Sequence, residues 1–268
     1  MPDILANGIR IHYEERGTGP AMVWAHGLGG TWQGWERVMD FFQGRYRVIA
    51  YDARGHGRSE IPARPEAYSQ DIMVQDLLGV MDALGVGRAI VGGHSMGANV
   101  ALNFALQYPE RCLGLIAVGI GSGSSDPEWW REYWGRLADL AEKQGMAAFL
   151  EEMKKVPAWA SAFALPGLGE EISRTVLNNS PGGIARTIRG VQKERPSIFA
   201  LEPKLEKLSV PTLVVMSQGD APVAECSRFM AQRIPGAVLE VIPARSHWTH
   251  LEAVEEFLSA VDRFARRL

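Results

Sequence analysis

The 268-residue sequence has only two cysteines, Cys112 and Cys226, and their spacing matches no metal-ligand pattern. The sequence alone does not decide whether they form a disulfide, but two thiols in so long a chain are typical of a reducing compartment. No apolar run approaches the roughly 20 residues that span a bilayer, and the opening residues lack the basic and apolar regions of a signal peptide. We therefore expect a cytoplasmic protein that does not enter a membrane, with both cysteines buried.

The sequence also lacks an excess of charge of either sign, because 28 Lys and Arg balance 31 Asp and Glu to a net charge of −3. Phosphate binding requires a concentrated basic surface, so we expect no nucleic-acid partner. We find no Walker A sequence, internal repeat or low-complexity tract. A chain of this length can bury a large core without disulfides. Its oligomeric state is not readable from the sequence.

Short apolar runs alternate with segments of helical periodicity along most of the chain. Asn7-Gly8 lies within an alternating segment and predicts a β-hairpin. Strands that are apolar on both faces predict an α/β fold with a mostly parallel sheet and helices on both faces. The expected strands after the hairpin are 21–26, 46–51, 89–94, 113–120, 211–217 and 238–243. Ligands bind beyond the carboxyl ends of such strands, so we expect the site there.

Residues 122–205 interrupt this alternation, since they contain no convincing strand and are helical and amphipathic. We expect a helical cap there, inserted between a core formed by residues 1–121 and 206–268. The stretch 121–127 is the nearest to a flexible hinge. Half of the eight tryptophans lie in the insertion, at Trp129, Trp130, Trp134 and Trp159. They either attach the cap to the core or line an apolar pocket above the site.

The sharpest signal is GHSMG at residues 93–97, directly after an apolar strand and before a helix. This context is that of a nucleophile elbow, in which Gly93 and Gly97 allow close approach of backbones around Ser95. A serine hydroxyl needs a base and an orienting carboxylate to become nucleophilic. Asp220 and His247 follow two later strands and complete the order nucleophile, acid, base.

On these residues the chain resembles the α/β-hydrolase superfamily over its whole length except the insertion. HGLGG at 26–30 resembles the oxyanion loop that follows the third strand in that family. DARGHGRS at 52–59 resembles the family's D-x-R-G-x-G-x-S loop, which follows the fourth strand. The resemblance implies that Ser95 attacks a carbonyl carbon, that His247 transfers the proton and that Asp220 orients His247. It implies an oxyanion hole formed by the backbone N–H groups of Leu28 and Met96, with no cofactor and no metal.

Other assignments of the same roles are weaker but open. His250 could replace His247 as the base, although Glu252 lies where the family pattern places a glutamate after the catalytic histidine. Asp126 could replace Asp220 as the acid. We interpret His94 as a packing residue and His12 as a surface strand residue. The loop residues are expected to stabilise their own loops: His26, His56, Asp52 and Arg54.

The resemblance implies a serine hydrolase of the carboxylesterase type that takes a small-molecule substrate, a small apolar ester or lactone. Serine at 95 argues against haloalkane dehalogenases and epoxide hydrolases, which carry an aspartate at the elbow. Cofactor-independent haloperoxidase-like esterases and dioxygenases share the scaffold. Carbon–carbon bond hydrolases, acyltransferases and triad-retaining small-molecule receptors are the alternatives, and turnover and product analysis separate them.

Overall fold

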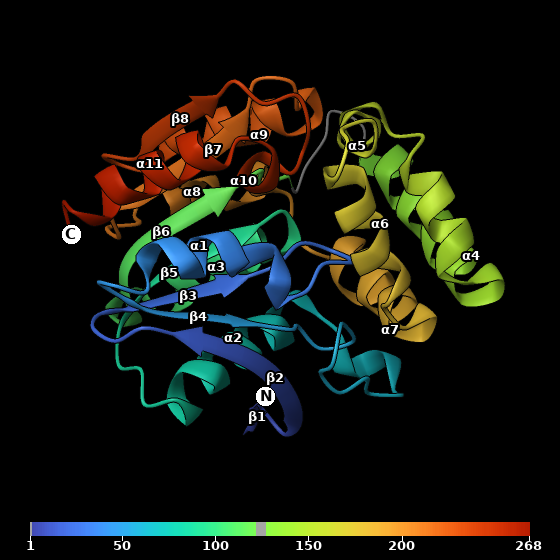
Figure 1. Ribbon diagram of the computed structural model, residues 1–268, viewed down its shortest axis with the longest axis horizontal. Helices are drawn as coiled ribbons and strands as arrows, with labels where there is room; N and C mark the ends of the chain where they lie inside the picture. Colours follow the sequence, from blue (N-terminus) through green and yellow to red (C-terminus); the bar gives the residue numbers. More distant parts are fainter. Residues whose placement is uncertain (1, 122–126) are drawn as a thin grey trace.

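Eight strands form one sheet in the order β1-β2-β4-β3-β5-β6-β7-β8 in the computed structural model, which describes residues 2–121 and 127–268 (Figure 1). β1 and β2 form the expected hairpin, and β2 is also antiparallel to β4, whereas all later pairs are parallel. The strands are β1 (Asp3–Ala6), β2 (Ile9–Arg16), β3 (Ala21–Ala25), β4 (Arg47–Tyr51), β5 (Ala89–His94), β6 (Cys112–Val118), β7 (Thr212–Ser217) and β8 (Val238–Ile242). The predicted α/β fold is confirmed.

Helices cover both faces of this sheet because alternate side chains of each strand point to opposite faces. Val23 of β3 belongs to one apolar cluster and its neighbours Met22 and Trp24 to another. The first cluster is closed by α2 (Gln70–Ala83), α3 (Met96–Gln107), α8 (Glu202–Leu205) and α9 (Ala221–Arg233). The second is closed by η1 (Trp32–Trp35), α1 (Glu36–Phe42) and α11 (Val254–Ala265).

Between β6 and β7 the described residues form helices and no strand, as the sequence predicts. They are α4 (Pro127–Met153), α5 (Pro157–Phe163), α6 (Leu168–Leu177), α7 (Pro181–Thr187), η4 (Ile188–Gln192), η5 (Ile198–Leu201) and α8. α4 to α7 stand together on the right of Figure 1, beyond the carboxyl ends of the parallel strands. These helices bury a third apolar cluster around Phe149, Leu137 and Ile184. The expected hinge falls largely on residues 122–126, which lie outside the described part.

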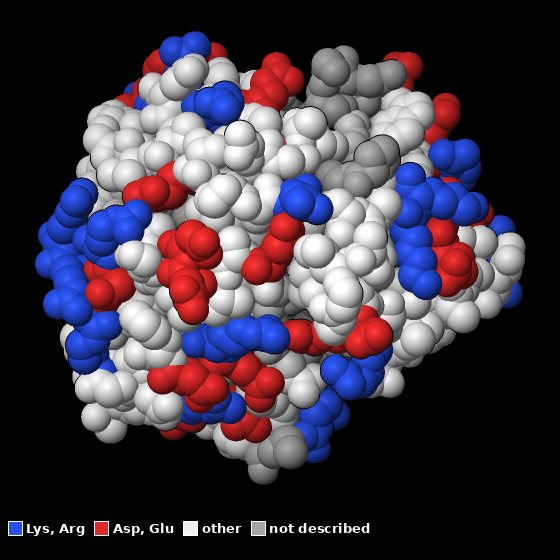
Figure 2. Space-filling view, turned by 45° about the horizontal axis from the view of Figure 1, so that its top comes forward, with Lys and Arg blue, Asp and Glu red and all other residues white. Residues whose placement is uncertain are grey.

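The remaining short elements lie in the connections: η2 (Pro65–Ala67), η3 (Pro109–Arg111) and α10 (Thr249–Glu252). Among the helices that the structure describes, none is both long enough and apolar enough to cross a membrane. Cys112 and Cys226 are buried and do not form a disulfide. Lys and Arg are interleaved with Asp and Glu over most of the face shown in Figure 2.

The sequence interpretation of His12 is wrong, because this residue is buried rather than at the surface. Its ring Nδ1 lies 2.9 Å from Oδ1 of Asp3, and its ring packs edge-on against Trp32. Its backbone N–H donates to Ser59 Oγ at 2.9 Å. The loop after β4 therefore folds over β2 and covers a residue that strand alternation alone places outside.

Candidate active site

The turn between β5 and α3 brings Ser95 to the carboxyl end of the central strand. A Cβ atom at Gly93 would lie 2.3 Å from the backbone of Gly97, and one at Gly97 would lie 2.1 Å from the carbonyl oxygen of Ala25. Real side chains do not tolerate such contacts, so both positions require glycine. Ser95 itself has a φ of 53° and a ψ of −108°. These features are those of the nucleophile elbow that the sequence predicts.

Asp220 and His247 are brought together from the ends of β7 and β8. Nδ1 of His247 lies 2.5 Å from Oδ2 of Asp220, and both side chains are buried. The carboxylate thus accepts the Nδ1 proton and leaves Nε2 as the free ring nitrogen. Ser95, Asp220 and His247 line the same cavity of about 420 Å³. The predicted base and acid therefore form a pair beside the predicted nucleophile.

The loop that carries His247 is held by two neighbours that are not part of this pair. The carboxylate of Glu252 accepts hydrogen bonds from the backbone N–H groups of Arg245 and Ser246, both at 2.8 Å. Nε2 of His94 lies 3.0 Å from the backbone oxygen of His247 and donates to it. His94 is thus more than a packing residue, because it fixes the backbone of His247. Burial lowers the pKa of His94 well below its usual value, which keeps the ring neutral.

The alternative base, His250, does not face Asp220. Its ring stacks on Trp35 with 4.5 Å between the ring centroids, and it is buried. Burial, together with the nearby His247, lowers the pKa of His250 to about 3. The alternative acid, Asp126, lies outside the described residues.

The loop at residues 26–30, which contains Leu28, lies directly against the elbow. A Cβ atom at Gly27 would lie 2.8 Å from Nδ1 of His94 and 3.4 Å from Cβ of Ser95. His26 holds the loop: its Nδ1 donates to the backbone oxygen of Gly27 at 2.7 Å, and its Nε2 accepts the backbone N–H of Ala53 at 2.9 Å. Burial lowers the pKa of His26 to about 4, so the ring is neutral and can serve both roles.

Asn179, which the sequence does not single out, connects this loop to the inserted helices. Its Nδ2 donates to the backbone oxygen of Gly29 at 2.9 Å, and its Oδ1 accepts the backbone N–H of Gly57 at 3.0 Å. Asn179 follows α6 and is buried. Nothing in the local sequence separates it from its exposed neighbour Asn178, because its partners lie more than 100 residues away.

The neighbouring loop is rigid for reasons that the sequence anticipates. Asp52 is buried and accepts the backbone N–H groups of Trp32 and Arg58, at 2.8 and 2.9 Å. The guanidinium of Arg54 forms a buried, two-pronged ion pair with Asp76, in which both N···O distances are 2.5 Å. His56 is buried, and its Nδ1 lies 3.1 Å from the backbone oxygen of Arg54.

The inserted segment contributes both charged and apolar side chains to the wall of the Ser95 cavity. The wall includes Trp130, Trp134, Val156 and Trp159 from the inserted segment, and Val223 from α9. Trp159 packs against the ring of His247 with a centroid separation of 6.4 Å. Part of the tryptophan cluster therefore lines the cavity, whereas Trp129 is half exposed and stacks on Tyr133.

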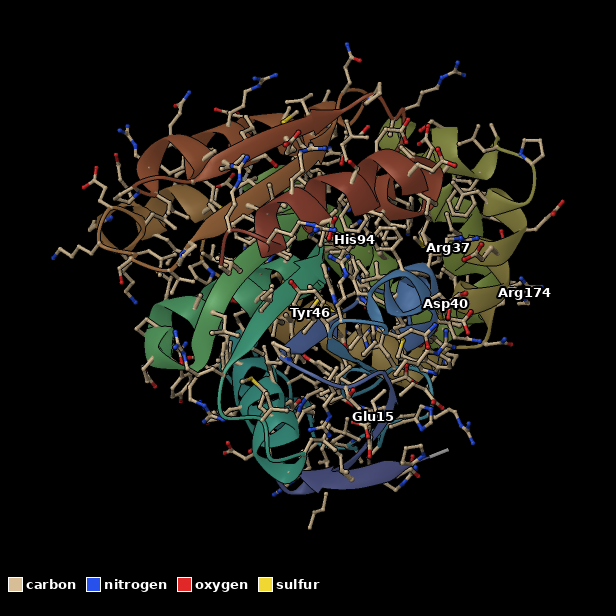
Figure 3. All side chains as sticks on the ribbon, turned by 60° about the vertical axis from the view of Figure 1, so that its left-hand side comes forward. Glu15, Arg37, Asp40, Tyr46, His94 and Arg174 are labelled. Atoms are coloured by element: carbon tan, nitrogen blue, oxygen red, sulfur yellow. The ribbon has the colours of Figure 1, made fainter. Side chains whose placement is uncertain are left out.

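A second cavity of about 440 Å³ lies on the other side of the 26–30 loop. Leu28, His94 and Trp248 line it, together with residues of α1 and α6. Figure 3 shows Arg37, Asp40 and Arg174 around the junction of these helices, with His94 further inside. At its rim Arg37 forms a two-pronged ion pair with Glu171.

No group of three or more His, Cys, Asp and Glu side chains within residues 2–121 and 127–268 is arranged to hold a metal ion. α3 begins at Met96, directly after Ser95, and the N–H groups in the first turn of a helix are free to interact with negative charge. The arrangement can therefore activate a serine and stabilise negative charge beside it.

A family model described as the alpha/beta hydrolase fold matches residues 20–254. The chain therefore belongs to the α/β-hydrolase family and is a hydrolase of that family. It is 34% identical over 261 residues to a putative carbamate hydrolase RutD of Caulobacter sp. strain K31, with 94% of each chain covered.

Two solved structures are similar over nearly their whole length. One is a thermophilic esterase from Thermogutta terrifontis, with a TM-score of 0.88 and 30% identity over 99% of this chain and 98% of that chain. The other is the enol-lactonase from Burkholderia xenovorans LB400, with a TM-score of 0.87 and 26% identity over 99% of this chain and 100% of that chain.

Proposed function

We propose that this protein hydrolyses small carboxylic esters or lactones through an acyl-enzyme on Ser95. The observation that carries the proposal is the Asp220–His247 pair, which lines the same cavity as a serine on a strained elbow. The similarity to an esterase and to an enol-lactonase supports the same chemistry. Serine rather than aspartate at position 95 favours acyl transfer over displacement at an alkyl carbon.

In this mechanism Nε2 of His247 takes the Ser95 proton as Oγ attacks the carbonyl carbon. Asp220, which accepts the Nδ1 proton, stabilises the imidazolium that forms. The backbone N–H groups of Leu28 and Met96 stabilise the oxyanion, and each such donor lowers the barrier by about 3 kcal/mol. His247 then protonates the leaving alcohol, and water activated by the same ring releases the acid.

Substrate size and polarity follow from the cavity. We propose that residues 122–205 form a cap whose side chains Trp130, Trp134 and Trp159 contact the acyl chain, above a core of residues 1–121 and 206–268. The aromatic and aliphatic side chains of the wall favour an acyl chain that is apolar along its length. The proposal includes a reducing, cytoplasmic location, which is supported by two buried cysteines that form no disulfide.

The experiment is hydrolysis of p-nitrophenyl esters of increasing acyl length by the wild type and by Ser95→Ala. We expect the substitution to lower kcat by at least about 1,000-fold with unchanged thermal unfolding, because Ser95 is the nucleophile. The chain length of fastest turnover measures the pocket. Retained activity in Ser95→Ala would contradict the mechanism, and inactivity of the wild type toward every ester would transfer the proposal to carbon–carbon bond hydrolysis or ligand reception.

A further inference from the structure

Arg195 lines the cavity that Ser95, Asp220 and His247 also line. It lies in the segment that leads from η4 back to the core. Its Nη2 donates to the backbone oxygen of Gly121 at 2.5 Å. Its Nη1 is buried and has no hydrogen-bond partner among the described residues. The cavity therefore contains a buried cationic donor that is only partly satisfied.

Leaving such a group unpaired is unfavourable, because burial removes water without replacing it. Burial lowers the pKa of Arg195 to about 10, so the group stays charged at neutral pH. No carboxylate within the described part of the chain forms an ion pair with it, whereas the buried Arg54 has Asp76. The fold thus supplies a counter-ion to Arg54, whereas none is found for Arg195 within residues 2–121 and 127–268.

The other charged residues of the cavity do not neutralise Arg195. Asp220 is paired with His247, and Glu194 is paired with Arg131 at 2.7 Å in an exposed contact. Lys193 also lines the cavity and has no ion pair among the residues described. Among the described residues, the charged groups of the cavity wall that lack an ion pair are therefore positive.

We propose that Arg195 binds a carboxylate at the far end of the substrate's acyl chain. The preferred substrates are then monoesters of short dicarboxylic acids, or lactones that carry a carboxylate. The methylene groups lie against Trp134 and Trp159, and the planar guanidinium offers the donor geometry that carboxylates require. The inference rests on the proposed ester chemistry at Ser95 and makes Arg195 a specificity-determining residue.

The test compares two p-nitrophenyl esters whose acyl groups both have five carbons, the neutral pentanoate and the anionic mono-glutarate. We expect the wild type to favour the glutarate ester, mainly through a lower KM. Arg195→Gln should reduce kcat/KM for the glutarate ester by about 10- to 100-fold, the usual effect of losing a charge-assisted hydrogen bond. Activity on the pentanoate ester should change less than about threefold, and Arg195→Lys should restore part of the preference.

Arg131→Gln is the matched control, because it removes a cation of the same cavity that already has a partner. Equal wild-type activity on the two esters would overturn the assignment of Arg195 while leaving the Ser95 chemistry intact. Equal loss on both esters in Arg195→Gln and Arg195→Lys would show that Arg195 serves only to hold Gly121. Ester hydrolysis that survives Ser95→Ala would instead refute the proposed function.

Discussion

Ser95 is held in a backbone conformation that costs a residue with a side chain about 1–3 kcal/mol. Two backbone hydrogen bonds maintain this conformation. The backbone N–H of Ser95 donates to the backbone oxygen of Val118 at 2.9 Å, and the backbone oxygen of Ser95 accepts from Nδ2 of Asn99 at 3.0 Å. The serine is thereby presented in one fixed orientation. Hydrolysis gains from this because no reorganisation is needed when the substrate arrives.

Glu252 acts at the same scale, on the loop that carries His247. Glu252→Gln replaces one acceptor oxygen with an NH₂ group that faces a backbone N–H, so one of the two 2.8 Å hydrogen bonds is lost. We expect kcat to fall about tenfold, in line with the loss of a hydrogen bond to a charged group, with little change in KM. Steady-state kinetics on one ester measure this.

Glu256→Gln is the control for that substitution, since Glu256 is exposed in the first turn of α11. Its kinetics should match the wild type. If Glu252→Gln and Glu256→Gln have the same activity, Glu252 does not position His247.

At the residue scale, the sequence predicts candidate groups for which local spacing and order along the chain are sufficient. Ser95 lies between two glycines, and the order of Asp220 and His247 follows the strands. Local spacing does not predict three other features: the burial of His12, the hydrogen bonds of Asn179 and the unpaired donor of Arg195. Each depends on neighbours from distant segments, and such neighbours are known only once the chain is folded.

The helices and strands are predicted closely, but their ends are not. The helical segment between β3 and β4 begins as η1 and becomes α1 only at Glu36. The helical segment after β8 is divided into α10 and α11 at Ala253, which has a φ of −114° and a ψ of 66°. Apolar periodicity indicates which face of a segment is buried. Because the buried face is the same on both sides of such a break, the periodicity does not reveal where one helix ends and the next begins.

Asn179 connects α6 to two loops of the core, and its loss should affect both stability and catalysis. In Asn179→Ala the carbonyl of Gly29 and the N–H of Gly57 lose their partner. We expect a loss of about 2–4 kcal/mol in the free energy of unfolding. Because the loop that carries Leu28 is no longer held, kcat should also decrease about tenfold. Denaturant unfolding and ester kinetics measure the two effects.

The adjacent exposed residue provides the comparison. Asn178→Ala should leave both quantities unchanged, since Asn178 ends the same helix without reaching the core loops. If Asn179→Ala lowers stability and leaves kcat unchanged, the position of the 26–30 loop does not depend on this connection.

At the scale of the whole molecule, several buried histidines make stability depend on pH. Burial lowers the pKa of His26 to about 4 and those of His56 and His250 to about 3, whereas the unfolded chain has values near 6.5. The unfolded state therefore binds more protons below pH 6.5. Stability is complete above that pH and decreases as the pH falls toward the folded pKa values.

We expect each of these three histidines to cost about 2 kcal/mol of stability at pH 5 relative to pH 7. Thermal unfolding should accordingly move to lower temperature over this interval. His250→Phe keeps an aromatic ring against Trp35 and removes one titrating group, so its stability should vary less with pH. A variant with the same pH dependence as the wild type would show that His250 does not contribute.

The close contact of Gly97 with the end of β3 has a consequence for the newly synthesised chain. The elbow needs β3 beneath it, β5 leading into it and β6 to receive the Ser95 amide, so three strands must pair before Ser95 takes its final geometry. Until then the chain carries an ordinary serine. The chain is thus hydrolytically inactive until these strands have paired, and the appearance of activity indicates that the centre of the sheet has assembled.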